Sequence, residues 1–139
     1  AVLEMLDEIK KNKWNVEIAA ETMGKVNVFG SVDDIKRLVK ETNCGFCLDF
    51  AHLLARSNGK MTYKEMVEEF KGFKIWRCHF SGIVYGDKGE KHHIKTSKKE
   101  LENLIKVLPK NKEITIINES PECFDDSLES LRILNNIKV

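Results

Sequence analysis

The hydrophobic residues of this chain change their spacing several times along its length, and each change predicts a new element. Apolar positions three and four residues apart indicate amphipathic helices, whereas short continuous or alternating apolar runs indicate strands. Helices are expected at residues 2–11, 31–42, 51–56, 62–70 and 97–108, and from Asp125 past Leu134. Strands are expected at residues 14–20, 45–49, 73–79 and 113–118.

Three of these helices begin with a capping box, in which a hydroxyl residue is followed three positions later by an acid. The boxes open at Ser31, Thr62 and Ser97. The element order is one helix followed by four strand–helix units, which predicts an α/β fold with a parallel sheet. Residues 80–96 are expected to form a long irregular stretch, and loops of that length are often functional.

Composition narrows the class of protein without choosing a function. The 23 basic and 22 acidic residues give a formal net charge of +1, so charge alone is no argument for nucleic-acid binding, although a local basic patch remains open. No apolar run approaches the roughly 18 residues of a membrane-spanning helix, and no secretory signal is visible. Cys44 and Cys47 have no second pair to complete a zinc ribbon, so packing is their simplest role, with a redox or metal-binding role as the alternative. Unpaired cysteines favour a cytoplasmic location.

A side chain that can bind a metal stands at the end of each predicted strand. These residues are Glu21, Asp49, His79 and Glu119. The carboxyl ends of parallel strands lie together and form binding sites. Carboxylates with imidazoles suit zinc, and also manganese or iron. The pattern predicts a metal centre, and because a carboxylate can bridge two ions it allows a two-metal centre.

Each ligand candidate alone has an ordinary alternative. An acid at the end of a strand is most often solvated or caps a helix, and His79 lies in an apolar setting that suits a core histidine. The neighbours His92 and His93 fit a solvated loop as well as a ligand pair. What favours a metal centre is that ligand-type residues stand together at the ends of four strands.

Five segments occur in the order found in the endonuclease IV family of xylose-isomerase-like barrels, and the chain resembles its archaeal members. The segments are Glu21-Thr22-Met23-Gly24-Lys25, Cys47-Leu48-Asp49-Phe50-Ala51-His52, Cys78-His79-Phe80-Ser81-Gly82-Ile83, Gly89-Glu90-Lys91-His92-His93 and Asn118-Glu119-Ser120-Pro121. The resemblance implies that residues 1–139 form a single partial domain, the carboxyl-terminal half of a TIM (β/α)8 barrel with a three-zinc centre. It further implies a hydrolase of DNA repair that cleaves on the 5′ side of abasic sites.

The same resemblance implies roles for single residues. Glu21 resembles a carboxylate that bridges two zinc ions, and Asp49, His79 and Glu119 resemble further ligands of one of them. Glu21, Asp49 and Glu119 are thereby the expected catalytic residues, and manganese is an alternative metal. His52 resembles a ligand of the third ion.

Loop residues are expected to complete the third site and to meet the DNA. One alignment supplies Glu90 with His92 as the loop ligands, and another supplies His93. Lys25 and Arg56 are candidates for contacts with DNA phosphates, against an ordinary solvated role.

The chain departs from the family pattern in its length. It holds about four of eight strand–helix units, and in the family two histidines of the first zinc lie on strands that would precede Ala1. Unpaired sheet edges favour association with the missing amino-terminal half or with a second copy. Two alternatives remain open: a one-metal sugar isomerase or epimerase of the same superfamily, and an inactive half-barrel fragment.

Overall fold

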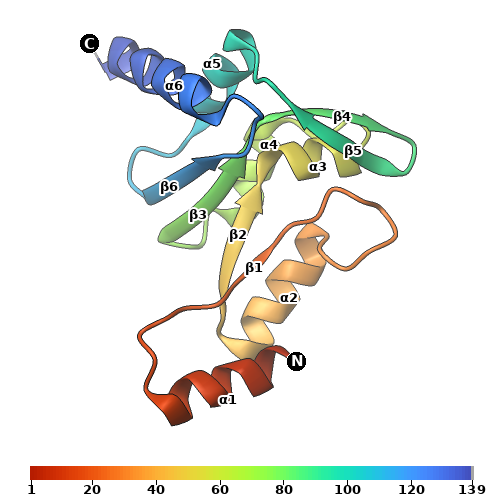
Figure 1. The fold of residues 1–139 in the computed structure, drawn as a ribbon, viewed down its shortest axis with the longest axis vertical. Coiled ribbons are helices and arrows are strands. Elements are labelled where there is room, and N and C mark those ends of the chain that lie inside the picture. The colour runs from red at the N-terminus through yellow and green to blue at the C-terminus, as the bar shows by residue number, and fades with distance from the viewer. Residues whose placement is uncertain (139) are drawn as a thin grey trace.

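The chain folds around one parallel sheet of four strands, as a computed structural model of residues 1–138 shows (Figure 1). The strands are β1 (Ala19–Glu21), β2 (Gly45–Asp49), β3 (Ile75–Phe80) and β6 (Glu113–Asn118), and they lie in the order β1-β2-β3-β6. The helices are α1 (Val2–Asn12), α2 (Val32–Thr42), α3 (Phe50–Arg56), α4 (Tyr63–Phe70), α5 (Lys98–Val107) and α6 (Cys123–Lys138). The prediction of an α/β fold with a parallel sheet is confirmed.

Local sequence sets most helix starts. Ser31 and Thr62 each accept a hydrogen bond from the backbone N–H three residues later, and the acid at that position accepts from the capping residue in return. The third box is only half formed. Ser97 accepts from the N–H of Glu100, but the Glu100 carboxylate accepts from the hydroxyl of Tyr63 instead, at 2.6 Å. A tertiary partner therefore replaces the local one.

The prediction of an irregular stretch at residues 80–96 is wrong. The chain there forms an antiparallel hairpin of β4 (Gly82–Gly86) and β5 (Gly89–Ile94), closed by a two-residue turn. Most residues of β5 are polar because much of the strand faces solvent. The sequence therefore shows no apolar alternation that would predict a strand there. Gly89 has a φ of +90°, and a Cβ there would lie 2.0 Å from the carbonyl oxygen of Gly24. Glycine at this position lets the hairpin approach the loop after β1.

Two boundaries also differ from the prediction. Residues 14–18 are not a strand, because β2 begins opposite Ala19 and offers them no partner. The last helix begins at Cys123, so Asp125 lies inside the helix and does not cap it.

The hydrophobic core lies on one face of the sheet. Alternate residues of β3 point into it, and Trp76, Cys78 and Phe80 are almost fully buried. On β2, Phe46 stacks on Phe70 of α4 with ring centroids 4.8 Å apart. This packing fixes the strands, and so it fixes where each strand ends.

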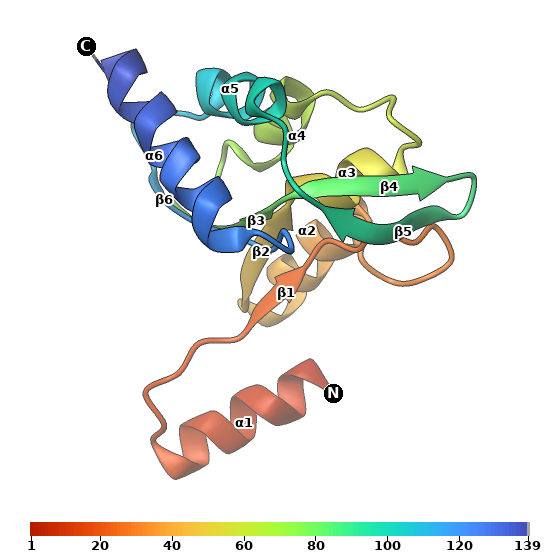
Figure 2. The ribbon, with the colours of Figure 1, turned by 45° about the horizontal axis from the view of Figure 1, so that its top comes forward.

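The opposite face of the sheet is open. Ile75 of β3 and Ile117 of β6 are 52% and 56% exposed, and register places them on the side away from Trp76. Helix α1 lies apart from the sheet in both views (Figures 1 and 2) and buries none of its residues. Within the described residues, β1 and β6 each have one unpaired edge. Unpaired edges beside exposed apolar residues favour association.

We propose that the isolated chain associates with a second copy through the open face. Light scattering is expected to give a mass above that of one chain. Ile75→Lys should lower that mass, because it places a charge on the open face, whereas Asn135→Lys at an exposed position of α6 should not. A monodisperse monomer with a cooperative thermal transition would contradict this proposal.

Candidate metal centre

Four ligand-type side chains converge at the carboxyl ends of the parallel strands. Glu21 and Asp49 end β1 and β2, His79 lies near the end of β3, and Glu119 follows β6. Each offers one ligand atom, and these atoms all lie within 4.8 Å of one another. The Nδ1 atom of His79 is 3.1 Å from Glu21 Oε1 and 3.2 Å from Glu119 Oε1. We call these four residues the strand-end cluster.

Asp49 is the most constrained member of the cluster. Its side chain is almost completely buried, and Oδ1 accepts a hydrogen bond of 2.7 Å from the N–H of His52, which caps α3. Oδ2 is buried and has no hydrogen-bond partner among the described residues. Burial raises the pKa of this carboxyl to about 6. Nδ1 of His52 lies 3.4 Å from this oxygen. A buried carboxylate oxygen without a hydrogen bond is costly, and a cation would satisfy it.

Thr22 ties Asp49 to His52. Its hydroxyl oxygen accepts from the N–H of Asp49 at 2.9 Å, and its carbonyl accepts from Nδ1 of His52 at 2.9 Å. Because a carbonyl can only accept, Nδ1 of His52 is the donor in this contact. No sequence pattern singles out Thr22, whose only signal is its position directly after Glu21.

A second set of ligand-type residues lies beside the cluster, formed by His52, Glu90 and His93. Nε2 of His52 is 3.1 Å from Oε2 of Glu90, which is buried and has no hydrogen-bond partner among the described residues. The rings of His52 and His93 have centroids 5.4 Å apart. We call these three residues the hairpin set.

The hydroxyl of Ser81 lies 2.6 Å from Nδ1 of His93. With Nδ1 occupied in this way, Nε2 is the nitrogen left for a ligand. An oxygen partner thus holds Nδ1 of both imidazoles, of His52 and of His93, which is the usual arrangement of histidines that bind metals.

A β-bulge decides which loop histidine joins the hairpin set. Val84 pairs with His92 and Tyr85 with Glu90, so Lys91 has no partner on β4. Regular alternation would place Glu90 and His92 on one face of the strand. The extra residue places Glu90 and His93 on one face instead, and His92 is exposed. Of the two alignments, the geometry favours His93.

The two residues expected to meet DNA lie on or beside the loop at residues 22–30. The guanidinium of Arg56 donates hydrogen bonds to four carbonyls of this loop, those of Met23, Lys25, Val26 and Val28. Arg56 therefore fixes the loop, and a phosphate would have to compete with these bonds. Lys25 is in the loop, where it forms a β-bridge with Gly89 of the hairpin.

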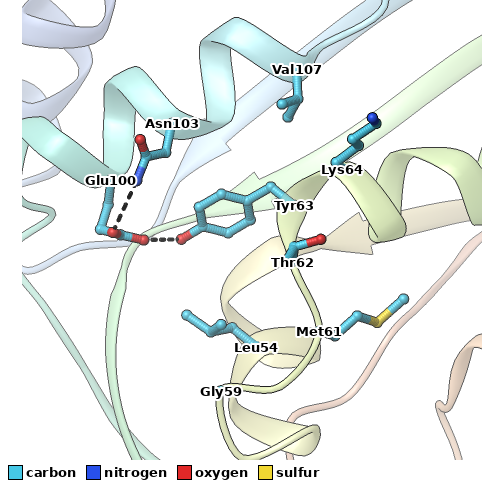
Figure 3. A pocket seen from close by; sticks show the side chains of 9 residues that line it. All are labelled: Leu54, Gly59, Met61, Thr62, Tyr63, Lys64, Glu100, Asn103 and Val107. Carbon is cyan, nitrogen blue, oxygen red and sulfur yellow. Dashed lines mark hydrogen bonds between the residues drawn. The ribbon is translucent and has the colours of Figure 1, made fainter.

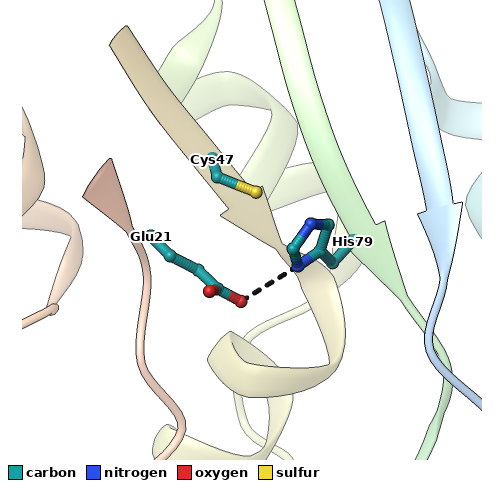
Figure 4. Close-up of side chains that lie close together, drawn as sticks. All are labelled: Glu21, Cys47 and His79. Carbon is teal, nitrogen blue, oxygen red and sulfur yellow. Dashed lines mark hydrogen bonds and ion pairs between the residues drawn. The ribbon is translucent and has the colours of Figure 1, made fainter. Parts of the chain in front are cut away.

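Cys47 belongs to the same region. It lies on β2 next to Glu21 in the sheet register, and its sulfur is within 4.8 Å of ligand atoms of Glu21 and His79 (Figure 4). Burial is the main cause that raises the pKa of its thiol to about 12. The thiol is therefore protonated at neutral pH in the absence of a metal. Packing alone does not describe Cys47, because its side chain faces the candidate site.

A separate groove lies between the segment that precedes α4 and helix α5 (Figure 3). Its volume is about 380 Å³. It shares no residue with the strand-end cluster or the hairpin set. Tyr63 and Glu100 both line the groove, and the Tyr63 hydroxyl already donates a hydrogen bond to the Glu100 carboxylate. The ligand-type residues therefore remain the stronger candidate site.

The burial of Asp49 predicts a pH dependence of stability in metal-free protein. Its folded pKa lies above the ordinary value of 3.8, so the folded state binds more protons and stability falls as pH rises from about 4 to about 6. Asp49→Asn keeps an oxygen to cap α3 and should remove about 2–3 kcal/mol of this fall. Denaturant unfolding with chelator present measures it. Parallel pH profiles for the two proteins would contradict the assignment.

The bulge predicts that the two adjacent histidines differ in their effect on metal binding. His93→Ala should weaken binding of one zinc ion by at least about 10–100-fold, because it removes a ligand of the hairpin set. His92→Ala is the matched control and should leave zinc binding unchanged. Isothermal titration with zinc distinguishes the two. A loss in His92→Ala with none in His93→Ala would show that the other alignment is right.

Comparison with known proteins identifies a relative but assigns no family. No family model matches the chain. An uncharacterized protein of Methanocaldococcus jannaschii is 33% identical to it over 150 aligned positions, which cover 98% of this chain and 55% of the relative. The chain thus spans about half the length of that protein. The similarity extends along nearly all of the chain, and the name of the relative assigns no activity to it.

Proposed function

We propose that this chain carries the metal-binding part of an endonuclease IV-like phosphodiesterase that cleaves DNA on the 5′ side of abasic sites. One observation carries the proposal: Glu21, Asp49, His79 and Glu119 converge from four neighbouring parallel strands. The hairpin set beside this cluster adds three more ligand-type side chains.

The residues fit divalent cations such as zinc or manganese. Carboxylates with imidazole nitrogens are common ligands of both. Each set also contains one buried carboxylate oxygen that has no hydrogen-bond partner in the described part of the chain, Oδ2 of Asp49 and Oε2 of Glu90. Like charges held this close are unfavourable unless a cation or a proton separates them. When bound, the metal would supply an acidified water and stabilise negative charge on a phosphodiester.

Glu21 is placed between the two sets. Its Oε1 is 3.1 Å from Nδ1 of His79 in the strand-end cluster and 3.4 Å from Nδ1 of His52 in the hairpin set. Glu21 thus contacts an imidazole of each set, although Nδ1 of His52 is the nitrogen that Thr22 holds. Thr22 forms hydrogen bonds with both Asp49 and His52. These bonds restrain the position of the strand-end cluster relative to the hairpin set.

The cluster is partly accessible to solvent. The side chains of Glu21 and Glu119 are 31% and 36% exposed, whereas that of Asp49 is 1% exposed. A substrate can therefore reach Glu21 and Glu119, which stand at the ends of the two edge strands of the sheet. Lys25 in the loop after β1 and Lys88 at the hairpin turn are both exposed. The β-bridge between Lys25 and Gly89 brings these two segments together, and both lysines suit contacts with phosphates. Abasic sites fit such an enzyme because exposing them breaks no base pair.

The finer fold assignment is part of this proposal. Successive strand–helix units whose strands are neighbours in the sheet are what half of a TIM (β/α)8 barrel would provide, and sites in that fold lie at the carboxyl ends of the strands. In the relative, the other 45% of the length leaves room for further units. Free cysteines suit a reducing compartment such as the cytoplasm. No helix of residues 1–138 is long and apolar enough to cross a membrane.

A one-metal sugar isomerase is the nearest alternative. It would need only the strand-end cluster. The hairpin set favours the phosphodiesterase, since a one-metal isomerase has no use for His52, Glu90 and His93 at this position.

The proposal predicts nicking of a duplex that contains one abasic site, in the presence of zinc or manganese. Glu119→Gln should lower the rate at least about 100-fold, because it removes a ligand of the strand-end cluster. Glu122→Gln is the matched control, since Glu122 is an exposed acid three residues away that pairs with Lys95. Gel analysis of the labelled strand measures the rate.

Three results would decide against the proposal. No nicking by the metal-loaded full-length protein would contradict the activity. Equal nicking of an intact duplex would contradict the abasic substrate. A single bound metal together with ketose–aldose turnover would support the isomerase instead.

A further inference from the structure

The thiol of Cys47 lies where a metal ligand would lie. Cys47 is 6% exposed, and its sulfur is within 4.8 Å of ligand atoms of both Glu21 and His79. Figure 4 shows the sulfur directed toward the space between these two side chains. Glutamate, histidine and cysteine from three neighbouring strands thus surround one point.

A second observation supports cation binding in this region. Oδ2 of Asp49, two residues along β2 from Cys47, is buried and has no hydrogen-bond partner among the described residues. Glu21 and His79 belong to two groups of ligand atoms: Asp49 and Glu119 complete one with oxygen atoms, and Cys47 completes the other with sulfur. The two ligand groups therefore overlap but differ in chemical softness.

We propose that Glu21, Cys47 and His79 form a thiolate-containing position for soft divalent cations, represented by Cd²⁺, next to the oxygen-rich position that Asp49 and Glu119 complete. The proposal rests on the proposed function in one respect, since the two positions share Glu21 and His79.

The chemistry of binding is a ligand exchange without oxidation. A bond forms between Sγ of Cys47 and the cation, the S–H bond breaks, and the proton passes to the buffer. Thiolate ligands favour soft and borderline cations, whereas Mn²⁺ and Mg²⁺ favour carboxylates. A soft cation would thus use Cys47, and Mn²⁺ would bind through the carboxylates without it. Because Glu21 and His79 serve both positions, Cd²⁺ should compete with Mn²⁺.

Titration of the protein with Cd²⁺ tests the proposal directly. Thiolate–cadmium bonds absorb in the ultraviolet, so one equivalent of Cd²⁺ should produce a charge-transfer band in the unmodified protein. Cys47→Ser should lose this band and bind Cd²⁺ at least about 10-fold more weakly. Its Mn²⁺ affinity, measured by electron paramagnetic resonance, should stay within about 3-fold of that of the unmodified protein.

Two control variants separate Cys47 from two of the other three thiols. Cys44→Ser changes another buried cysteine of the same C-x-x-C segment, and Cys123→Ser removes the exposed one. Both should keep the band. Cys47→Ala provides a second test if a buried serine prevents folding, and circular dichroism confirms that each variant is folded.

Several outcomes would overturn the proposal. They are a missing band in the unmodified protein, a band that persists in Cys47→Ser and Cys47→Ala, or an equal loss of Mn²⁺ and Cd²⁺ affinity in folded Cys47 variants. Its failure is distinct from that of the proposed function. A Cys47-dependent band without nicking of abasic DNA would support the soft-metal position alone, and nicking without the band would support the phosphodiesterase alone.

Discussion

The candidate site depends on the hydrogen bonds that Thr22 makes across the ends of β1 and β2. Its hydroxyl accepts from the N–H of Asp49, and its carbonyl accepts from the imidazole of His52. These bonds fix the backbone at Asp49 and the proton of His52 at the same time. Because Thr22 is fully buried, water cannot replace either partner without cost. One residue therefore sets the relation between the strand-end cluster and the hairpin set.

The second structural constraint is the β-bulge in the hairpin. An exposed hairpin inserted between β3 and α5 would contribute little to the core, but it places Glu90 and His93 over the amino-terminal end of α3, where His52 lies. The bulge at Lys91 is what brings both side chains to one face. Gly89 allows the same hairpin to contact the loop after β1, and Arg56 holds that loop from the other side. The local irregularities of the fold are thus concentrated around the candidate site.

Electrostatics oppose the close approach of these residues in the metal-free protein. Within the strand-end cluster, the three carboxylates repel one another and Asp49 is deprived of water, which raises its pKa. Such an arrangement lowers the stability of the metal-free fold. Proteins tolerate this cost where a ligand repays it, and perturbed pKa values of buried acids are accordingly common at functional sites. The buried Cys47 adds a ligand of different softness to the same region.

The sequence by itself determined the parallel α/β fold, because hydrophobic spacing and capping boxes are local and act within one element. Strand β2 lies at residues 45–49 as predicted, and β6 at 113–118. The sequence also indicated the four strand-end residues, since the carboxyl ends of parallel strands meet in any such sheet. Their individual roles remain proposals.

Tertiary structure alone decided the rest. The polar sequence of β5 gave no strand signal, because the hairpin is stabilised by pairing and by contact with α3 and the loop after β1. The choice between His92 and His93 depended on one unpaired residue in that strand, which shifts every later side chain to the other face. The roles of Thr22, Ser81 and Arg56 come from hydrogen bonds to residues 12 to 33 positions away, and no local pattern specifies such partners.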